Sequence, residues 1–499
     1  MCHPECSMPY DLQALAYQSL LAEGFSPQFG PAAQAQVAAL TDPAASTAHP
    51  VTNLRALPWS SIDNDTSRDL DQIEVAERLP GGRICLRIGI ADVDAAVPLG
   101  SPIDLHAAHE TTTVYAGVVV FPMLPEPLST GLTSLLEAHD RLVLVTEIIV
   151  EPDGHVEESS VYRAVARNQW QLTYSGVGPW LEGAAPPPKV AASEVLQPQL
   201  RLQQEAAVAL RQARLSRGAL QFERMETEAI VEHGQVIGLT AHRRNLAALL
   251  IEDLMLAANE AMARHLRDHH VASIRRVVRA PERWDRLVAI AAALGTQLPP
   301  QPDPAALSHF LQERRTQSPA NFHQLSLSVM KLLGPGEYAV ELPGDTVPDH
   351  FSLAAQNYAH STAPNRRFAD VVTQRIVKAG LAGDPSPYSV PALTLIARQC
   401  TLREDAARKV ERLMEKRMAA VALAGRVGEV FAAVVTGVND KGIFVRVSDP
   451  PLEGKLVEAG SLCDVGDTIQ VRLRGVDVPR GHIDFTRQIQ PRTAPATTR

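Results

Sequence analysis

Four aspartates lie within nine positions, just before a segment that is predicted to be a strand. They are Asp63, Asp65, Asp69 and Asp71, and no lysine stands between them. In an extended chain Asp69 and Asp71 point to the same face. Carboxylates that converge in this way repel one another and raise their pKa values unless a cation lies between them. Magnesium prefers oxygen ligands and shares them with substrate phosphates. The segment therefore predicts a magnesium site for phosphoryl chemistry, with an acidic turn before an edge strand as the alternative.

A second segment whose residues could take part in a reaction is 360–370, where two arginines follow a proline. Pro364 fixes a turn, Arg366 and Arg367 come next, and a helix is predicted to open at Asp370. Guanidinium groups placed in this way can hold a phosphate. Arginine pairs are also common on helix surfaces, so this segment indicates phosphate chemistry only in combination with the aspartates.

The elements that must position these residues follow from hydrophobic periodicity. Alternating segments predict a hairpin of strands at 72–77 and 84–90 and a second strand pair at 142–150 and 155–166. Helical spacing of apolar residues is found at 9–23, 31–40, 196–217, 245–268 and 392–425. Short strand-like runs between Gly428 and Phe485 predict a small all-β barrel. The fold class is therefore a multidomain α/β protein.

Length and composition exclude several classes of protein. At 499 residues the chain is long enough for two to four domains. With 45% hydrophobic and 21% charged residues, and no apolar run near 18–20 residues, it is not predicted to be a membrane protein. No secretory signal is visible, and the five cysteines form no C-x-x-C pair. We therefore expect a cytoplasmic protein with reduced thiols.

Charge is distributed unevenly along the chain. The formal net charge is −9, but residues 1–100 carry 5 basic and 12 acidic side chains, whereas residues 401–499 carry 16 basic and 13 acidic ones. This asymmetry suits a chain that concentrates carboxylates at one site and meets an anionic polymer at another. Two solvated surfaces of different composition explain it equally well.

Taken together, the two chemical segments resemble the signatures of the ribonuclease II (RNB) family of exoribonucleases. The first family signature reads roughly I-D-x-x-x-x-x-D-[LMIF]-D-D; Asp63, Asp69 and Asp71 are in register with it, and Gln72 stands at its last aspartate. The late signature, roughly H-x-T-S-P-I-R-R-[YF]-x-D, is similar to 360–370. Further matches to family motifs occur in the family's order at 87–93, 114–115, 121–125, 164–167, 218–222 and 251–260. The chain is identified as a member on this ordered set.

The resemblance implies a domain organisation. It predicts a catalytic domain at 56–425, built as a mixed sheet surrounded by helices, and an S1-type OB-fold barrel at 426–490. Residues 491–499 are a polar tail. Residues 1–55 are too few for the two cold-shock-type domains of the family's longer members, so we expect a small helical module, either helix-turn-helix-like or a simple cap on the next domain.

The resemblance also implies an activity and roles for residues. In this family, magnesium ions (or manganese in their place) activate a water that hydrolyses the last phosphodiester of single-stranded RNA, releasing nucleoside 5′-monophosphates from the 3′ end. Asp63, Asp69 and Asp71 would hold the metal, with Asp69 and Asp71 counted as catalytic. Arg366 would contact the scissile phosphate, while Arg367 would make a supporting or structural contact. We expect a monomer whose partner is single-stranded RNA.

Besides Arg367, whose supporting contact would be to a phosphate of the RNA, five residues are predicted to bind RNA by the same resemblance. Tyr115 and Phe222 match an aromatic pair that clamps the terminal bases, for which core packing is the alternative. Glu252 matches a glutamate near the RNA 3′ end, and otherwise belongs to a solvated helix face. In the barrel, Lys441 replaces an expected aromatic residue. This favours phosphate contact over stacking there, with Phe444 as the remaining stacking residue.

Gln72 is the main departure from the family pattern. An amide keeps an oxygen ligand but removes one negative charge from a site that holds cations. Asp65, Asp92 and Asp94 are the candidates to compensate. The departure leaves a second hypothesis open, a catalytically silent RNA-binding member of the family. A regulatory factor that uses the barrel alone would explain neither the aspartates nor Arg366.

Overall fold

The structure of the chain is a computed structural model. It describes residues 10–45, 51–223, 225–232, 235–345, 348–355, 357–439, 442–457, 463 and 466–488. Lys441 and the tail at 491–499 lie outside the described residues. None of the helices in the described ranges is long and apolar enough to cross a membrane.

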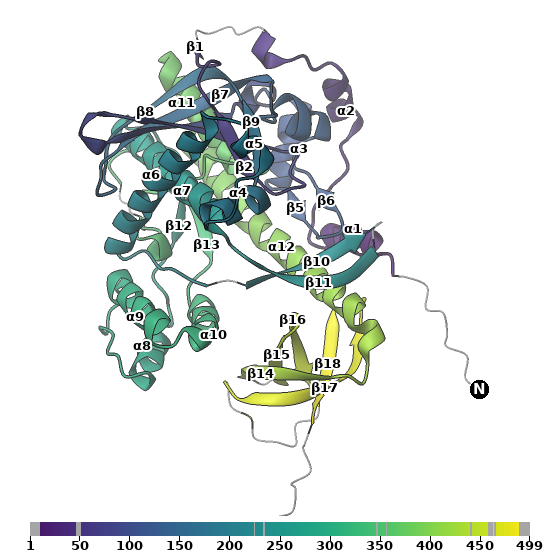
Figure 1. The fold of residues 1–499 in the computed structure, drawn as a ribbon. Helices are drawn as coiled ribbons and strands as arrows, with labels where there is room; N and C mark the ends of the chain where they lie inside the picture. The colour runs from purple at the N-terminus through teal and green to yellow at the C-terminus, as the bar shows by residue number, and fades with distance from the viewer. Residues whose placement is uncertain are drawn as a thin grey trace, which may run out of the picture.

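A seven-stranded mixed sheet lies in the upper part of the molecule in the view of Figure 1. Across the sheet the strands are β1 (Thr52–Asn53), β8 (Val156–Arg167), β7 (Asp140–Val150), β4 (Ile84–Ala91), β3 (Gln72–Arg78), β2 (Ser60–Asp63) and β9 (Trp170–Thr173). β1 runs parallel to β8 and β2 parallel to β9, while the other neighbours are antiparallel. The predicted mixed sheet is therefore confirmed.

The central hairpin agrees with the alternating pattern of its sequence. Gln72 pairs with Ile90 at its open end, and Gly81 and Gly82 turn the chain with φ values of 79° and 82°. Glycine adopts this left-handed region without the steric cost of a Cβ. Ile73 belongs to the cluster on one face of the sheet, whereas Ala76 belongs to the cluster on the other. The hairpin thus separates two cores.

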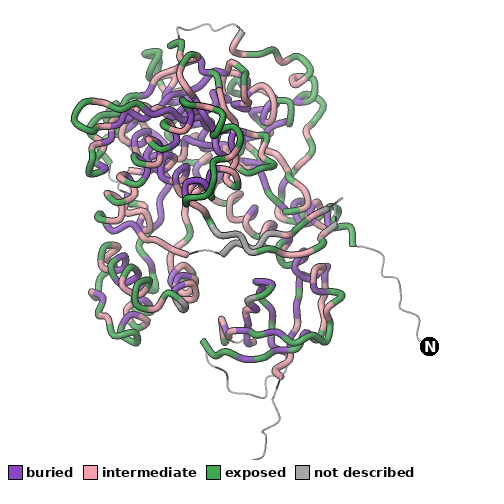
Figure 2. Tube along the Cα trace, in the orientation of Figure 1, coloured by how far each residue is buried: buried purple, intermediate pink, exposed green. Residues whose placement is uncertain are grey.

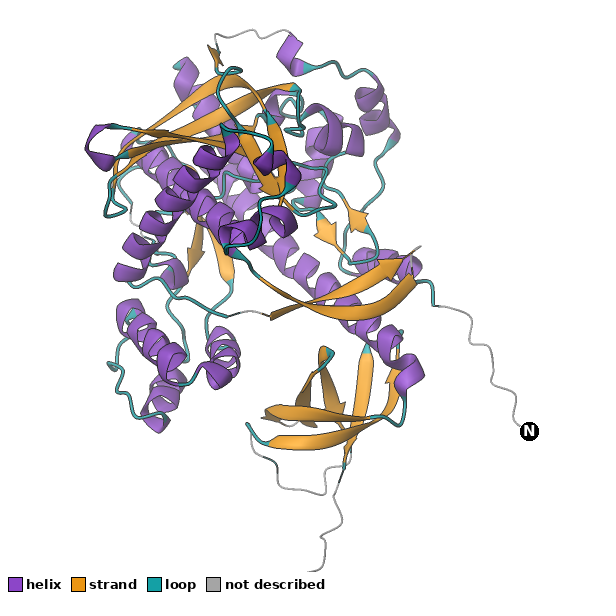
Figure 3. Ribbon diagram, in the orientation of Figure 1, coloured by secondary structure: helices purple, strands orange, loops and turns teal. Residues whose placement is uncertain are grey.

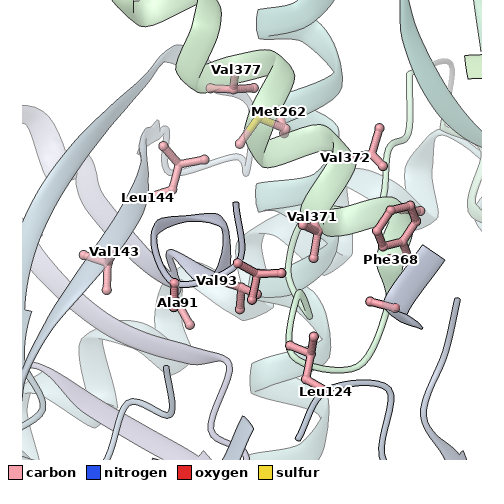
Figure 4. Packing of buried hydrophobic residues seen from close by; sticks show 14 of the residues in the cluster. Ala91, Val93, Leu124, Val143, Leu144, Met262, Phe368, Val371, Val372 and Val377 are labelled. Carbon is pink, nitrogen blue, oxygen red and sulfur yellow. The ribbon is translucent and has the colours of Figure 1, made fainter. Parts of the chain in front are cut away.

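Helices cover both faces of this sheet (Figure 3). α6 (Leu196–Ser216) and α7 (Leu246–Asp268) pack on the face that carries Ile62 and Leu86. α3 (Pro102–Glu110) and α11 (Phe368–Ala382) pack on the opposite face. Figure 4 shows Val371 and Val377 of α11 in this second cluster, together with Leu144 of β7 and Met262 of α7. Buried residues gather in the sheet and the helices against it (Figure 2).

A smaller helical unit lies beside the sheet and has a core of its own. It contains α8 (Trp284–Ala293), α9 (Pro304–Gln317) and α10 (Pro319–Met330). Its cluster includes Trp284, Leu287 and Phe310. The strand pair β12 (Ser273–Val278) and β13 (Gly336–Glu341) flanks the unit in sequence and joins it to the rest of the domain.

The C-terminal strands close into a barrel, as predicted. In barrel order they are β14 (Val430–Asn439), β15 (Gly442–Ser448), β16 (Pro451–Leu456), β18 (His482–Arg487) and β17 (Thr468–Asp477). The long helix α12 (Val390–Leu423) leads to the barrel and packs with it in one hydrophobic cluster. A second hairpin, β10 (Met225–Glu232) with β11 (Gln235–Arg243), also packs along α12.

The N-terminal helices dock on two different parts of the molecule. α1 (Leu12–Ala22) shares a cluster with α12 and the barrel, and Arg417 donates hydrogen bonds to Leu15 O and Ser19 Oγ at 3.0 and 2.7 Å. α2 (Pro31–Ala38) packs on α3 in the main core. Within the described ranges the two helices share no hydrophobic cluster. They therefore cap the domains behind them and do not pack as a helix-turn-helix unit.

Candidate active site

Asp71 lies at the end of the aspartate segment, where the chain enters β3. Its Oδ1 accepts a hydrogen bond of 2.9 Å from the backbone N–H of Asn365, 294 positions away in the sequence. Its Oδ2 lies 3.4 Å from Nε of Arg366. Asp71 is only 2% exposed. Burial raises its pKa to about 7, against the lowering effects of Arg366 and the Asn365 N–H.

The loop that carries Arg366 is held from two sides. From α7, the Oδ1 atom of Asn259 accepts hydrogen bonds from the backbone N–H and the hydroxyl of Ser361, both at 2.9 Å. At the other end, the carbonyl oxygen of Arg366 accepts a 3.0 Å bond from the backbone N–H of Thr113. The backbone of the loop is therefore fixed before any substrate binds, which is the condition for a precise phosphate contact.

The two arginines of the loop have different environments. Arg367 makes a bidentate contact with the fully buried Asp370, through Nε at 2.9 Å and Nη2 at 2.8 Å. This is a structural contact, one of the two alternatives that the sequence left for Arg367. The side chain of Arg366 is 49% exposed, against 26% for that of Arg367. Only Arg366 is free to reach an incoming phosphate.

The other two aspartates of the signature have local partners. Asp63 ends β2, and its Oδ1 accepts hydrogen bonds from Ser67 Oγ at 2.8 Å and from the Asn64 N–H at 2.7 Å. Asp69 accepts a 3.2 Å hydrogen bond from the hydroxyl of Tyr115. Asp63 and Asp69 are both half-buried, in contrast to the buried Asp71.

The carboxylates of Asp63, Asp69 and Asp71 are of the chemical type that binds a hard divalent cation. Its side chains offer carboxylate oxygens, and the buried Asp71 lacks full compensation for its charge. In the part of the chain that the structure describes, no three histidine, cysteine, aspartate or glutamate side chains are gathered closely enough to hold a metal ion. Magnesium commonly takes one or two carboxylates and completes its shell with water and phosphate oxygens. The ligand set Asp63, Asp69 and Asp71 therefore stays a prediction.

Gln72 is the first residue of β3 and is buried. Its Nε2 lies 3.5 Å from the carbonyl oxygen of Ile62 on the neighbouring strand. Successive side chains of a strand alternate between faces, so Gln72 and Asp71 leave the chain in different directions. Whether the Gln72 amide reaches a bound metal stays a prediction.

The acids expected to compensate for Gln72 are already engaged elsewhere. Asp92 and Asp94 both contact Lys378, at 2.7 and 2.8 Å. Asp65 accepts a 2.6 Å hydrogen bond from Ser175 Oγ. The expectation for Asp92 and Asp94 is corrected by these contacts, because their charge is neutralised by a cation of the protein itself.

The predicted aromatic clamp residues are placed differently from each other. Tyr115, in the short strand β5 (Val114–Tyr115), is 41% exposed, and its backbone N–H donates to Glu411 of α12 at 3.1 Å. Core packing therefore does not explain Tyr115. Phe222 is half-buried against the core of α8, α9 and α10. Its role in binding a base stays a prediction.

Two of the remaining predicted RNA contacts, Glu252 and Phe444, are at least partly exposed. Glu252 forms an ion pair with Arg244 at 2.7 Å, and both side chains are about half exposed. Phe444 lies on β15 between the buried Ile443 and Val445, so it faces out of the barrel. Lys441 lies outside the described residues. These RNA contacts stay predictions.

Some residues that build the site were not singled out from the sequence. Asp370 had a usable signal, because an acid three positions after Arg367 on a helix can pair with it. Asn259 and Asn365 had none, since their partners come from distant segments. Contacts of this kind appear only once the chain is folded.

Comparison with family models finds two matches along the chain. The RNB domain matches residues 51–383. The RNase II-type exonuclease C-terminal S1 domain matches residues 429–488. The first match contains the sheet, the aspartate segment and the arginine loop, and the second coincides with the closed barrel.

Curated relatives and solved structures point in the same direction. Ribonuclease R of Thermotoga maritima is 31% identical over 464 residues, covering 85% of this chain and 63% of the relative. Ribonuclease R of Escherichia coli is 30% identical over 477 residues, covering 87% of this chain and 57% of the relative. This chain thus spans about three fifths of the length of the curated relatives it matches. RNase R of Mycoplasma genitalium, solved in its apo form, has a TM-score of 0.86 at 22% identity, covering 96% of this chain and 78% of that one. The Mycoplasma protein has also been solved with ribose-methylated single-stranded RNA and with double-stranded RNA.

Proposed function

Because this chain belongs to the RNB family, we propose that it hydrolyses single-stranded RNA from its 3′ end and releases nucleoside 5′-monophosphates. One observation carries the proposal most strongly. The buried carboxylate of Asp71 meets the half-exposed guanidinium of Arg366 at 3.4 Å, although the two residues come from distant segments. Both residues stand at the signature positions of the family. The loop itself is held to α11 by a different contact, that of Arg367 with Asp370.

The roles of the side chains follow from their environments. Arg366 directs its exposed donors at the scissile phosphate and stabilises the charge that develops in the transition state. Magnesium, or manganese in its place, held by Asp63, Asp69 and Asp71, would lower the pKa of the attacking water and neutralise the leaving oxygen. Asp71 supplies the buried negative charge of this set, held in place by the Asn365 N–H.

Exposed rings and the barrel are proposed to hold the RNA strand. The ring of Tyr115 is accessible beside Asp69, where a terminal base can stack on it. The barrel, with Phe444 on its outer face, would guide the strand by phosphate contacts and stacking. Both kinds of contact tolerate any sequence, which suits an enzyme that removes successive nucleotides.

Digestion of single-stranded RNA labelled at the 5′ end tests the proposal directly. We expect progressive shortening from the 3′ end, release of 5′-monophosphates, and loss of activity in chelator that added magnesium restores. The Asp71→Asn protein, purified in parallel, controls for contaminating nuclease. Internal cleavage fragments, or full activity in chelator, would contradict the proposal.

A second candidate function is favoured by one observation, the neutral Gln72 at the family's last aspartate. A catalytically silent member would bind the same RNA but leave its length unchanged at every magnesium concentration. The digestion assay, combined with a gel-shift measurement on the same RNA, separates this candidate from the exoribonuclease.

Tyr115 offers a test of the base clamp, because its ring and its hydroxyl can be removed separately. Tyr115→Ala should lengthen the final products, since losing the stacking face weakens the hold on short RNA by ~1–3 kcal/mol. Tyr115→Phe keeps the ring and loses only the hydrogen bond to Asp69, so its final products should match those of the unaltered protein. Gel analysis of the end products measures both variants. If Tyr115→Ala also gave unaltered products, Tyr115 would not be a clamp.

A further inference from the structure

Glu74 is a fully buried carboxyl group without a partner in the described part of the chain. It lies in the middle of β3 and is 0% exposed. Neither of its carboxyl oxygens has a hydrogen-bond partner there. Burial raises the pKa of Glu74 well above its usual range, and the carboxylate of Asp63 adds to this effect, so the group is neutral unless a cation comes close. A charge placed in this way requires either a proton or a cation.

The position of Glu74 relates it to the candidate metal site. It follows Gln72 by two residues in the same strand, so the two side chains lie on the same face of the sheet. Glu74 pairs with Ser60 of the neighbouring strand β2, and that strand ends at Asp63. Gln72 contacts Ile62, the residue before Asp63, and the carboxylate of Asp63 is near enough to raise the pKa of Glu74. The chain lacks a carboxylate at position 72. At position 74 it has one without a hydrogen-bond partner among the described residues.

We propose that Glu74 supplies the negative charge that Gln72 lacks, and that it strengthens divalent-cation binding at the Asp63 end of the site. The inference rests on the proposed function, in which that cation serves phosphodiester hydrolysis. Glu74 acts here through the charge that it places behind Asp63 and Gln72, and it is not assigned as a direct ligand. Outer residues that hydrogen-bond to metal ligands commonly change metal affinity by 10–100-fold, and we expect an effect at the lower end of this range from the charge of Glu74 alone.

The main rival is a neutral Glu74 that belongs only to the protein core. Gln203 of α6 is also fully buried, and its Nε2 lies 3.3 Å from the carbonyl oxygen of Glu74 and 3.4 Å from Ser60 Oγ. The side-chain oxygen of Gln203 has no partner among the described residues. A protonated Glu74 could donate to this oxygen. In that case Glu74 would contribute no charge to the site.

Metal binding without RNA separates the two cases. Calorimetric titration of manganese into the full chain is compared with the same titration of Glu74→Gln, Gln72→Asp and the double variant. We expect Glu74→Gln to weaken manganese binding at least about tenfold. Gln72→Asp should restore most of that affinity in the Glu74→Gln background, because a carboxylate then returns to the same face of β3.

Every outcome of this titration decides the question. The isosteric Glu74→Gln replaces an unpartnered carboxyl group, whether charged or protonated, by a neutral amide of the same shape, so we expect it to fold with about the stability of the unaltered protein in chelator. A variant that folds and binds manganese as before overturns the inference, as does a variant that fails to fold. Because RNA is absent, a failure of the exoribonuclease proposal in the digestion assay remains separate from a failure of this one.

Discussion

Replacing Asp71 by asparagine is expected to abolish hydrolysis of RNA while leaving RNA binding largely intact. The substitution keeps an oxygen for the Asn365 N–H at 2.9 Å but removes the buried charge that the cation and the attacking water require. Affinity for RNA comes mainly from backbone phosphates and stacked bases along the strand, which the substitution does not touch. Single-turnover digestion and a filter-binding titration on the same RNA measure the two effects. A parallel loss of binding would contradict the assignment.

The stability of the same variant checks that it is folded, and its pH dependence has a definite sign. The pKa of Asp71 is raised from 3.8 to about 7 in the folded protein. Ionising this carboxyl therefore destabilises the folded state increasingly between pH 4 and pH 7, and by a constant amount above that. In chelator, Asp71→Asn should be more stable at pH 8 by at most about 4 kcal/mol, with the difference vanishing towards pH 4. Urea unfolding at pH 5 and pH 8 measures this, and lower stability at pH 8 would indicate a folding defect.

Arg366→Ala is expected to reduce turnover by ~10²–10³, as the loss of a group that stabilises transition-state charge does. The loop should stay in place, because it is the backbone carbonyl of Arg366 that bonds to Thr113. The substrate remains bound through its other phosphates, so KM should change little. Steady-state kinetics on a short single-stranded RNA separates kcat from KM. A fall in affinity with unchanged turnover would contradict this role.

The matched control variants are Arg367→Ala and Arg366→Lys. Arg367→Ala removes the bidentate partner of the buried Asp370, so it should lower the free energy of unfolding. Arg366→Lys retains the positive charge but not the planar fork of donors. It should recover part of the lost turnover without changing stability.

The local elements of this protein were predictable because their causes lie within short stretches of sequence. Alternation fixes the hairpin of β3 and β4, and its turn requires the glycines at 81 and 82. The helices at 196–216 and 246–268 follow from their apolar faces. The spacing of Asp63, Asp69 and Asp71 and the late arginine pair, together with the further motif matches in the family's order, identified the family.

The pKa values and pairing of the site residues depend on contacts between distant segments. The spacing of residues in the sequence does not predict these contacts. The pKa of Asp71 is raised because folding buries its carboxyl group against a loop 294 positions away. Arg366 and Arg367 are adjacent and alike in sequence, yet only Arg367 is bound by Asp370. The charge of Asp92 and Asp94 is neutralised by Lys378 of α11, while Glu74, an ordinary strand residue in the sequence, is buried without a hydrogen-bond partner among the residues that the structure describes. Types and spacings of residues thus determined the family and the candidate chemistry, whereas burial and pairing, which set the pKa and availability of each group, were decided only by the tertiary structure.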